Sequence, residues 1–459
     1  MHTLCAFANG FTKKSFLTPL GKAAFLCDNI PMRAFISQSA SSFAFLRPGY
    51  QKANALDPLG NTTLLDYQIN VLRNNGVTEI YLAYPAGNKI IPEKYKNEGD
   101  IYLISVPKSL GNAGALCYVP KDEDILFVPG DLVFDVCLKR FFEFHKAHEG
   151  YLTCLSHPEP HPEQKDVLLL QNNINGFIIL PKETSSARDF YYSNLIPTEL
   201  SILSPDLLAI FDEEDPYPLN FREDVFDPTL ANGCVVSYYS AEYVQRISGK
   251  AEYLRIQEDV KAGIPERKNA SRPQKAFFLD RDGTINVFGD FVVRPDMLTL
   301  IPGAAKAIAK INRAGYLAIC VTNQPVVARG ETTMQEMTNI LANLEMMLGK
   351  EGAYLDAIYF CPHYPRKFPE SNEEYTMPCT CRKPGIGLLE EAKKAFNIDY
   401  SESWFIGDTT RDVQTGLNAG THTALLLGGD PHYNKRYGDA VPERTFQTLE
   451  EAIDDILGE

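Results

Sequence analysis

Short runs of β-branched and aromatic residues alternate along the chain with stretches that have helical spacing. This alternation predicts mainly parallel sheets covered by helices. In the second half we expect strands at residues 276–280, 316–321, 357–360, 404–406 and 423–427, and helices at 303–314 and 332–348. The pattern therefore predicts an α/β protein.

Residues 262–274 show neither the spacing of a helix nor the alternation of a strand; they are polar and include two prolines. We place a linker between two domains there. A chain of 459 residues exceeds one ordinary core, and two domains of about 150–250 residues are expected. The predicted organisation is an extension at 1–31, a domain at 32–261, the linker, and a domain at 275–459. Both domains are expected to be Rossmann-like, with three layers.

The composition changes this picture little. Apolar residues make up 44% and charged residues 22%, which excludes a largely disordered or fibrous protein. With 44 basic and 59 acidic residues the net charge is −15, so we expect no nucleic-acid or membrane partner. We find no apolar run of about 18 residues and read no secretory signal, so we expect a cytoplasmic location. The oligomeric state stays open.

An acidic turn directly follows the strand predicted at residues 276–280. It contains Asp280, Asp282 and Gly283 in the order Asp-Arg-Asp-Gly-Thr. Two carboxylates spaced in this way can share a divalent cation, while one attacks phosphorus and the other handles the proton. The ordinary alternative for such a turn alone is a solvated surface loop.

Three further features follow other predicted strands or loops. Thr322 and Asn323 end one strand, Lys383 follows a short loop, and Asp408 and Asp412 follow another strand. Alone, Lys383 could be a surface lysine and Asp408 a helix N-cap. Since ligands of open α/β sheets bind at the carboxyl ends of the strands, we expect these groups to share one crevice.

Together these segments resemble the four motifs of the haloacid dehalogenase superfamily of phosphotransferases, over about residues 275–430. More narrowly, DRDGTINV, VTNQ, ARG, CPH, CTCRKPG and GDTTRD resemble the branch that contains D-glycero-D-manno-heptose 1,7-bisphosphate phosphatases and histidinol-phosphate phosphatases.

This resemblance implies hydrolysis in two steps through an aspartyl-phosphate. Asp280 would be the nucleophile, and Asp282 would protonate the leaving group and then activate water. Mg²⁺ would be held by the Asp280 carboxylate, the Asp282 carbonyl and Asp408, and Asp412 would orient Lys383 or a metal-bound water. The implied catalytic residues also include Thr322 and Lys383, and the implied substrate contacts are Thr322, Asn323, Gln324, Arg382 and Lys383.

A second metal site is indicated by the cysteines, of which the chain has ten. Cys361, His363, Cys379 and Cys381 supply three thiolates and an imidazole, a set that fits a closed, structural Zn²⁺ site. The alternative is three buried cysteines and a surface histidine. Because Arg382 and Lys383 follow Cys381 directly, we expect zinc to position them at the rim of the active site.

The substrate is expected to be a small phosphate ester. The long zinc loop and Asn286-Val287 resemble the heptose enzymes rather than the histidinol phosphatases. Two segments depart from the heptose pattern: Pro325-Val326 after TNQ, and residues 288–291 after Asn286-Val287. Both are expected to line the substrate entrance, so a changed or relaxed sugar phosphate is compatible with the sequence.

The first half resembles the sugar-phosphate nucleotidyltransferases over about residues 32–260. The resemblance implies that the turn at residues 110–114 contacts a base and that Asp131 holds a metal. The family's glycine-rich loop is missing after residues 32–36, and Ala44 stands where its arginine would be, although Lys52 is kept. Arg246 stands in place of the second metal-binding aspartate. We therefore expect little or no nucleotide transfer.

The sequence thus predicts a Mg²⁺-dependent phosphatase acting on a sugar phosphate, best matched by a heptose bisphosphate, with a degenerate nucleotidyltransferase domain that could still bind a nucleotide or sugar. Three alternatives stay open. The chain could be a bifunctional nucleotidyltransferase and phosphatase, a histidinol-phosphate phosphatase, or a scaffold without enzymatic activity that senses a sugar nucleotide.

Overall fold

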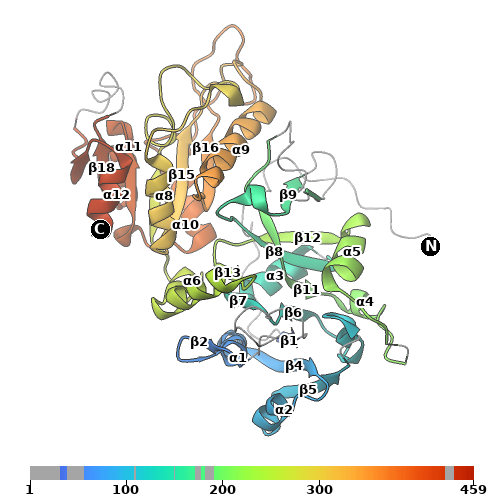
Figure 1. The fold of residues 1–459 in the computed structure, drawn as a ribbon. Coiled ribbons are helices and arrows are strands. Elements are labelled where there is room, and N and C mark those ends of the chain that lie inside the picture. The colour runs from blue at the N-terminus through green and yellow to red at the C-terminus, as the bar shows by residue number, and fades with distance from the viewer. Residues whose placement is uncertain are drawn as a thin grey trace.

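The computed structural model describes residues 32–38, 56–107, 110–148, 150–170, 177–180, 191–214, 216–428 and 439–458. The predicted extension at 1–31 lies outside these residues, as do Ala44, Lys52 and most of the loop after the first strand. Within the described residues the chain forms one seven-stranded and one six-stranded sheet, each covered by helices, as Figure 1 shows. The predicted α/β class is confirmed.

The sheet of the first half has the strand order β12-β8-β11-β6-β1-β4-β5. Its neighbours pair in parallel except β11, which is antiparallel to β6 and β8. The strands are β1 (Met32–Ser37), β4 (Val77–Pro85), β5 (Ile101–Val106), β6 (Ile125–Pro129), β8 (Leu152–His157), β11 (Ile196–Leu203) and β12 (Val235–Tyr239).

Helices and short ribbons surround this sheet. The helices are α1 (Leu64–Asn74), α2 (Ile90–Tyr95), α3 (Leu138–His148), α4 (Pro205–Leu208), α5 (Asp227–Ala231) and α6 (Lys250–Lys261). The ribbons pair β2 (Pro58–Leu59) with β3 (Thr62–Thr63), β7 (Leu132–Asp135) with β13 (Tyr243–Arg246), and β9 (Val167–Leu170) with β10 (Phe177–Leu180).

Alternation along β1 shows why the fold has three layers. Ala34 and Ile36 pack into a core with residues of α1 and α3, whereas Phe35 packs into a second core with Phe127 and Phe221. Successive side chains of a strand point to opposite faces, so a strand that is apolar throughout must be covered on both.

The second sheet is parallel throughout, with the order β16-β15-β14-β17-β18-β19. Its strands are β14 (Ala276–Leu279), β15 (Leu317–Asn323), β16 (Ala357–Cys361), β17 (Trp404–Gly407), β18 (His422–Leu426) and β19 (Arg444–Phe446). The covering helices are α8 (Ala304–Arg313), α9 (Met334–Lys350), α10 (Gly387–Phe396), α11 (Thr410–Ala419) and α12 (Leu449–Leu457). The five strands and two helices predicted for this half are all present, with ends shifted by at most a few residues.

The segment between the halves differs from the expected polar tract without periodicity. Helix α7 (Ile264–Lys268) lies within it, and Ile264, Asn269 and Gln274 are buried. The polar members can be buried because they are hydrogen-bonded: the Asn269 amide donates to the Asp135 carboxylate at 2.6 Å, and the Gln274 amide donates to the Asn269 carbonyl at 2.8 Å. The segment is a packed connection, and its role as a domain boundary stays a prediction.

No helix in the described part of the chain is long and apolar enough to cross a membrane.

Candidate active site

The candidate catalytic residues follow three neighbouring strands of the second sheet. Asp280 comes directly after β14, Thr322 and Asn323 end β15, and Asp408 comes directly after β17. The strands β15, β14 and β17 are adjacent and parallel, so their carboxyl ends meet at one edge of the sheet. The topology therefore brings together side chains that are far apart in the sequence.

Three carboxylates and one lysine meet at this edge. Oxygens of Asp280, Asp408 and Asp412 lie within 4.8 Å of one another, and all three residues are buried. The Lys383 ammonium lies 2.8 Å from Asp280 Oδ1 and 2.6 Å from Asp412 Oδ1, and Lys383 is 2% exposed. One cation thus faces three acids at a largely buried edge of the sheet.

This excess of negative charge, together with burial, changes the pKa values of the three acids. Burial, followed by the neighbouring Asp412, raises the pKa of Asp280 to about 6. Burial and the Asp280 charge raise the pKa of Asp408 to about 8. Burial is also the largest influence on Asp412 and acts to raise its pKa, but the charges of Lys383 and Arg411 and the hydrogen bonds from Lys383 and Thr409 together outweigh it and leave that pKa below the ordinary value. A divalent cation would supply the missing positive charge, and crowded carboxylate oxygens are the ligands that Mg²⁺ takes.

The glycine of the acidic turn is required by the close approach of Asp408. Gly283 has φ 79°, a left-handed conformation that glycine adopts freely. A Cβ at this position would lie 2.0 Å from Asp408 Oδ2. The turn can therefore bring its carboxylates to Asp408 only with a glycine at position 283.

The Asp282 carboxylate is surrounded by donors. Its Oδ1 accepts from the Arg281 guanidinium at 2.6 and 3.0 Å and from the Asn286 amide at 3.0 Å, and its Oδ2 accepts from the Gln324 amide at 2.9 Å. Burial would raise the pKa of Asp282, but Arg281 and the hydrogen bonds outweigh it and hold the pKa below its usual value. The resting carboxylate is therefore ionised.

Arg281 and Asn286 are residues to which the sequence assigned no site role. Both are fully buried, and both bind the carboxylate of Asp282. A signal for Arg281 was available, because a charged residue between two acids on a strand-to-loop turn must either reach solvent or pair. For Asn286 the only signal was its position four residues after Asp282.

The polar residues at the end of β15 and directly after it make hydrogen bonds within the protein. The Asn323 side chain accepts from the Lys383 backbone N–H at 2.9 Å and donates to the Lys383 carbonyl at 3.2 Å. The Gln324 amide donates to Asp282 and, at 3.0 Å, to the Thr322 hydroxyl. Thr322 is 1% exposed. The expected substrate contacts Thr322, Asn323, Gln324 and Lys383 thus lie together around the acidic turn.

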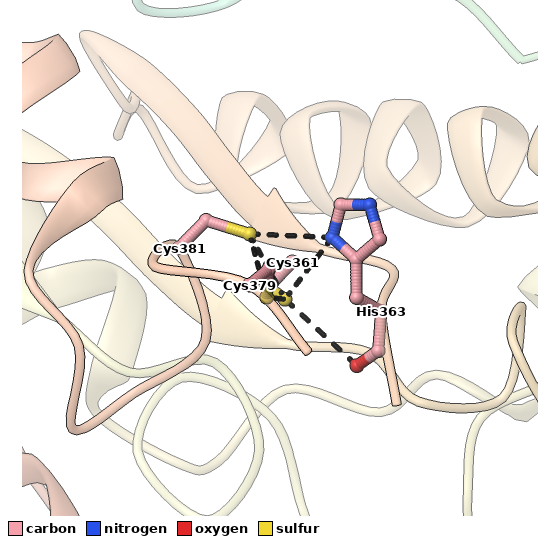
Figure 2. Close-up of side chains that lie close together, drawn as sticks. All are labelled: Cys361, His363, Cys379 and Cys381. Carbon is pink, nitrogen blue, oxygen red and sulfur yellow. Dashed lines mark hydrogen bonds between the residues drawn. The ribbon is translucent and has the colours of Figure 1, made fainter. Parts of the chain in front are cut away.

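The four predicted zinc ligands also meet, as Figure 2 shows. The sulfurs of Cys361, Cys379 and Cys381 lie 3.2–3.5 Å apart, and His363 Nδ1 lies 3.3 Å from Cys381 Sγ and 3.8 Å from Cys361 Sγ. Around a tetrahedral Zn²⁺, with sulfur at about 2.3 Å and nitrogen at about 2.0–2.1 Å, two sulfurs lie about 3.8 Å apart and a sulfur and a nitrogen about 3.6 Å apart. The donor set suits this metal, and the sulfurs here lie somewhat closer together than a bound ion would hold them.

Arg382 lies between the cysteine cluster and the lysine. Its guanidinium donates to the His363 carbonyl at 3.2 Å and lies 4.9 Å from the centre of the Tyr364 ring. Burial, and to a lesser degree the nearby Arg411, lower its pKa. The segment that carries Lys383 is therefore attached to the cysteine cluster by side-chain contacts as well as by sequence.

In the first half, Asp131 and Arg246 form an ion pair. Arg246 Nε lies 3.1 Å from Asp131 Oδ2, and its Nη1 donates to Glu199 Oε1 at 2.9 Å. The two carboxylates of this cluster thus share one guanidinium. The turn at residues 110–114 lies close to the backbone of Leu219, which would lie 2.2 Å from a Cβ at Gly111.

Comparison with known proteins agrees with the geometry of the second half. The HAD-hydrolase-like family model matches residues 380–452. D-glycero-beta-D-manno-heptose-1,7-bisphosphate 7-phosphatase of Haemophilus ducreyi is 39% identical over 155 residues, which are 34% of this chain and 83% of that protein. The enzyme of Escherichia coli K12 is 36% identical over 152 residues, 33% of this chain and 78% of that protein.

Solved structures resemble each half separately. The heptose 1,7-bisphosphate phosphatase of B. bronchiseptica, complexed with magnesium and phosphate, is 30% identical and covers 40% of this chain and 99% of its own, with a TM-score of 0.36. A protein of Bacillus anthracis designated a glucose-1-phosphate thymidylyltransferase is 15% identical and covers 50% of this chain and 96% of its own, with a TM-score of 0.42.

The motifs at the sheet edge and the sequence shared with these relatives lead to one assignment: through its second half, the chain belongs to the HAD-like family of heptose bisphosphate phosphatases.

Proposed function

We propose that the second half hydrolyses a sugar phosphate through a covalent intermediate on Asp280. The observation that carries this proposal is the lysine bound between two acids: Lys383 lies against Asp280 and Asp412 in a buried, strongly acidic edge. A transferring phosphoryl group is anionic and little bonded in its transition state, so positioning and positive charge provide most of the catalysis.

Each side chain has a separate role in the two steps. Asp280 Oδ attacks phosphorus while the bond from phosphorus to the leaving oxygen breaks, and Asp282 donates a proton to that oxygen. Asp282 then accepts a proton from water as the water oxygen attacks phosphorus and the bond to Asp280 breaks. Because the resting Asp282 is ionised, it must take up a proton as the ester binds. Thr322, the backbone N–H groups near Asn323, and Lys383 contact the phosphoryl oxygens.

The carboxylates of Asp280 and Asp408, with the Asp282 carbonyl, are the residues that would hold Mg²⁺. When bound, this metal supplies positive charge to the phosphoryl oxygens. Asp412 orients Lys383 through the 2.6 Å ion pair. Cys361, His363, Cys379 and Cys381 are the residues that would hold Zn²⁺, which would serve structure rather than catalysis because the protein supplies four ligands.

The substrate we propose is a heptose bisphosphate, because the relatives that match the second half carry that activity in their names. Histidinol phosphate is the alternative. A screen of sugar monophosphates, sugar bisphosphates and histidinol phosphate, with wild type and Asp280→Asn side by side, tests both. We expect the highest kcat/KM on a heptose bisphosphate and no turnover by Asp280→Asn; preference for histidinol phosphate would favour the alternative.

For the first half we propose that nucleotide transfer is absent. The support is the Arg246 guanidinium, which occupies the carboxylates of Asp131 and Glu199 that a divalent cation would otherwise contact. A guanidinium has no lone pair for a metal and is always charged. Incubation with nucleoside triphosphates and sugar 1-phosphates, assayed for pyrophosphate, should give none. Robust release would instead identify a bifunctional enzyme.

A further inference from the structure

The amide of Gln324 joins two groups of the proposed reaction. Gln324 follows β15 and is 1% exposed. Its Nε2 donates to Asp282 Oδ2 at 2.9 Å and to Thr322 Oγ1 at 3.0 Å. An amide nitrogen has two hydrogens, so both are committed to protein acceptors. The sequence suggested a substrate contact, but this nitrogen has no donor left for a substrate.

The backbone of Gln324 is fixed as well. Its N–H donates to the Cys361 carbonyl at 2.8 Å, directly beyond the pairing of Asn323 with Cys361 between β15 and β16. Cys361 is the first residue of the cysteine cluster. The backbone of Gln324 is therefore fixed to the end of β16, and that strand end is in turn fixed by the proposed zinc site.

The two hydrogen bonds have different consequences. Asp282 Oδ1 is bound by Arg281 and Asn286 on one side, and the Gln324 bond to Oδ2 fixes the rotation of the carboxylate. The Thr322 hydroxyl accepts from Gln324, which leaves its own hydrogen available to donate to a phosphoryl oxygen. The amide thus sets the distance between the proton-transferring carboxylate and the phosphoryl contact.

We propose that Gln324 is a positioning residue that fixes the Asp282 carboxylate relative to Thr322 for proton transfer. This inference rests on the proposed function, since it assigns no new reaction. Displacing a catalytic group by about 1 Å can cost about 100-fold in rate, so a residue that never touches substrate can still control turnover.

The leaving group distinguishes this role from a general structural one. A sugar alkoxide needs a proton from Asp282 when its bond to phosphorus breaks and the bond from Asp280 forms. The nitrophenolate of para-nitrophenyl phosphate is stable as an anion and leaves without that proton. Loss of Gln324 should therefore slow formation of the phosphoryl-enzyme from a sugar phosphate and leave its formation from the aryl ester almost unchanged.

The test compares wild type with Gln324→Met, which keeps the length of the side chain and removes the donor. On a sugar bisphosphate we expect kcat to fall about 10- to 100-fold with KM within about threefold. In rapid-quench single turnovers, transfer from para-nitrophenyl phosphate to Asp280 should stay within about threefold of wild type.

Gln274→Met is the matched control. Gln274 is 3% exposed, and its amide also donates twice, to the carbonyls of Asn269 and Arg272, but in the connecting segment. It should lower the melting temperature without the selective loss on the sugar ester. If Gln324→Met does not fold, Gln324→Asn, which keeps the amide but shortens its reach, must show the same selectivity between esters.

Three results would overturn the inference: an equal loss of the first step on both esters, a rise in KM with kcat unchanged, or unchanged kinetics. Failure of the proposed function would look different. The wild-type protein would then turn over no phosphate ester, or Asp280→Asn would keep full activity.

Discussion

At the scale of single residues, the site is defined by one buried lysine among acids. Lys383 Nζ contacts Asp280 and Asp412 within 2.8 Å, and Asp408 shares the same space without contacting a cation. Opposite charges interact more strongly where they are buried than at the surface, and a buried charge without a partner is costly. These few buried charges therefore account for the proposed chemistry, and they also make the stability of the protein depend on pH.

Replacing Lys383 by Met should lower kcat by about 100- to 1000-fold, because a donor to the transferring phosphoryl group is lost. The three carboxylates also lose their protein cation, so the melting temperature in magnesium-free buffer should fall and should recover in part with Mg²⁺. Lys394→Met, an exposed lysine of α10, is the control. Steady-state kinetics and thermal melts check both parts; a Lys383→Met enzyme with normal kcat contradicts the role.

The raised pKa values of Asp280 and Asp408, about 6 and about 8, predict a pH dependence of the metal-free site. An acid with a folded-state pKa above its unfolded value favours the folded state at low pH, and this contribution is lost as pH rises through the folded-state pKa. Stability should therefore fall between about pH 4 and pH 8. Melts of protein dialysed free of magnesium should show this fall, and it should be smaller in Asp408→Asn than in wild type or in the exposed control Asp296→Asn. A steeper fall in Asp408→Asn would contradict the assignment.

At the scale of elements, the sheet edge is the part that the sequence predicts best. Apolar runs such as residues 276–279 can be recognised because a strand buried on both faces is apolar throughout, and parallel strands end at a common edge. The gathering of Asp280, Lys383 and Asp408 followed from that rule together with the motif resemblance. Of the partners of Asp282, only Arg281 carried a signal in the sequence; the hydrogen bonds from Asn286 and Gln324 could not be foreseen, because they depend on side-chain placement within the loops.

The loop that carries the cysteine cluster should affect catalysis through the residues it positions. Removing its metal should free Cys381, and with it Arg382 and Lys383, and should loosen the Cys361 carbonyl that holds Gln324. We expect a loss of at least about tenfold in kcat when zinc is removed by a chelator and Mg²⁺ is then restored in excess. Metal analysis and kinetics on the same samples check this. Unchanged activity at zero zinc content would contradict it, and Cys234→Ser, outside the cluster, is the control.

At the scale of the whole molecule, the connection between the halves is buried and ionic. Lys268 of α7 lies 3.7 Å from Asp356 Oδ1, Asp356 Oδ2 accepts from the Ala318 N–H at 2.7 Å, and the Tyr239 hydroxyl of the first half donates to the Asp356 carbonyl. The sequence predicted a linker here because polar residues and prolines are typical of one. It could not show that these polar groups find partners in both halves, which depends on how the halves pack.

Removing one partner of this buried pair should destabilise the chain without altering the chemistry. Lys268→Met leaves the Asp356 charge buried and should cost about 3–5 kcal/mol in the free energy of unfolding, with kcat within about twofold. Lys275→Met breaks an exposed ion pair with Glu402 and should cost at most about 1 kcal/mol. Denaturant titrations measure both; equal effects of the two variants would show that the buried pair does not hold the halves together.

The central claim is that Asp280 carries the phosphoryl group during turnover. Rapid acid quench of wild type with a labelled sugar phosphate, followed by peptide mapping, tests it most directly. The account predicts a phosphorylated peptide containing Asp280, and no such peptide in Asp280→Asn. A label on another residue, or turnover by Asp280→Asn at the wild-type rate, would contradict it.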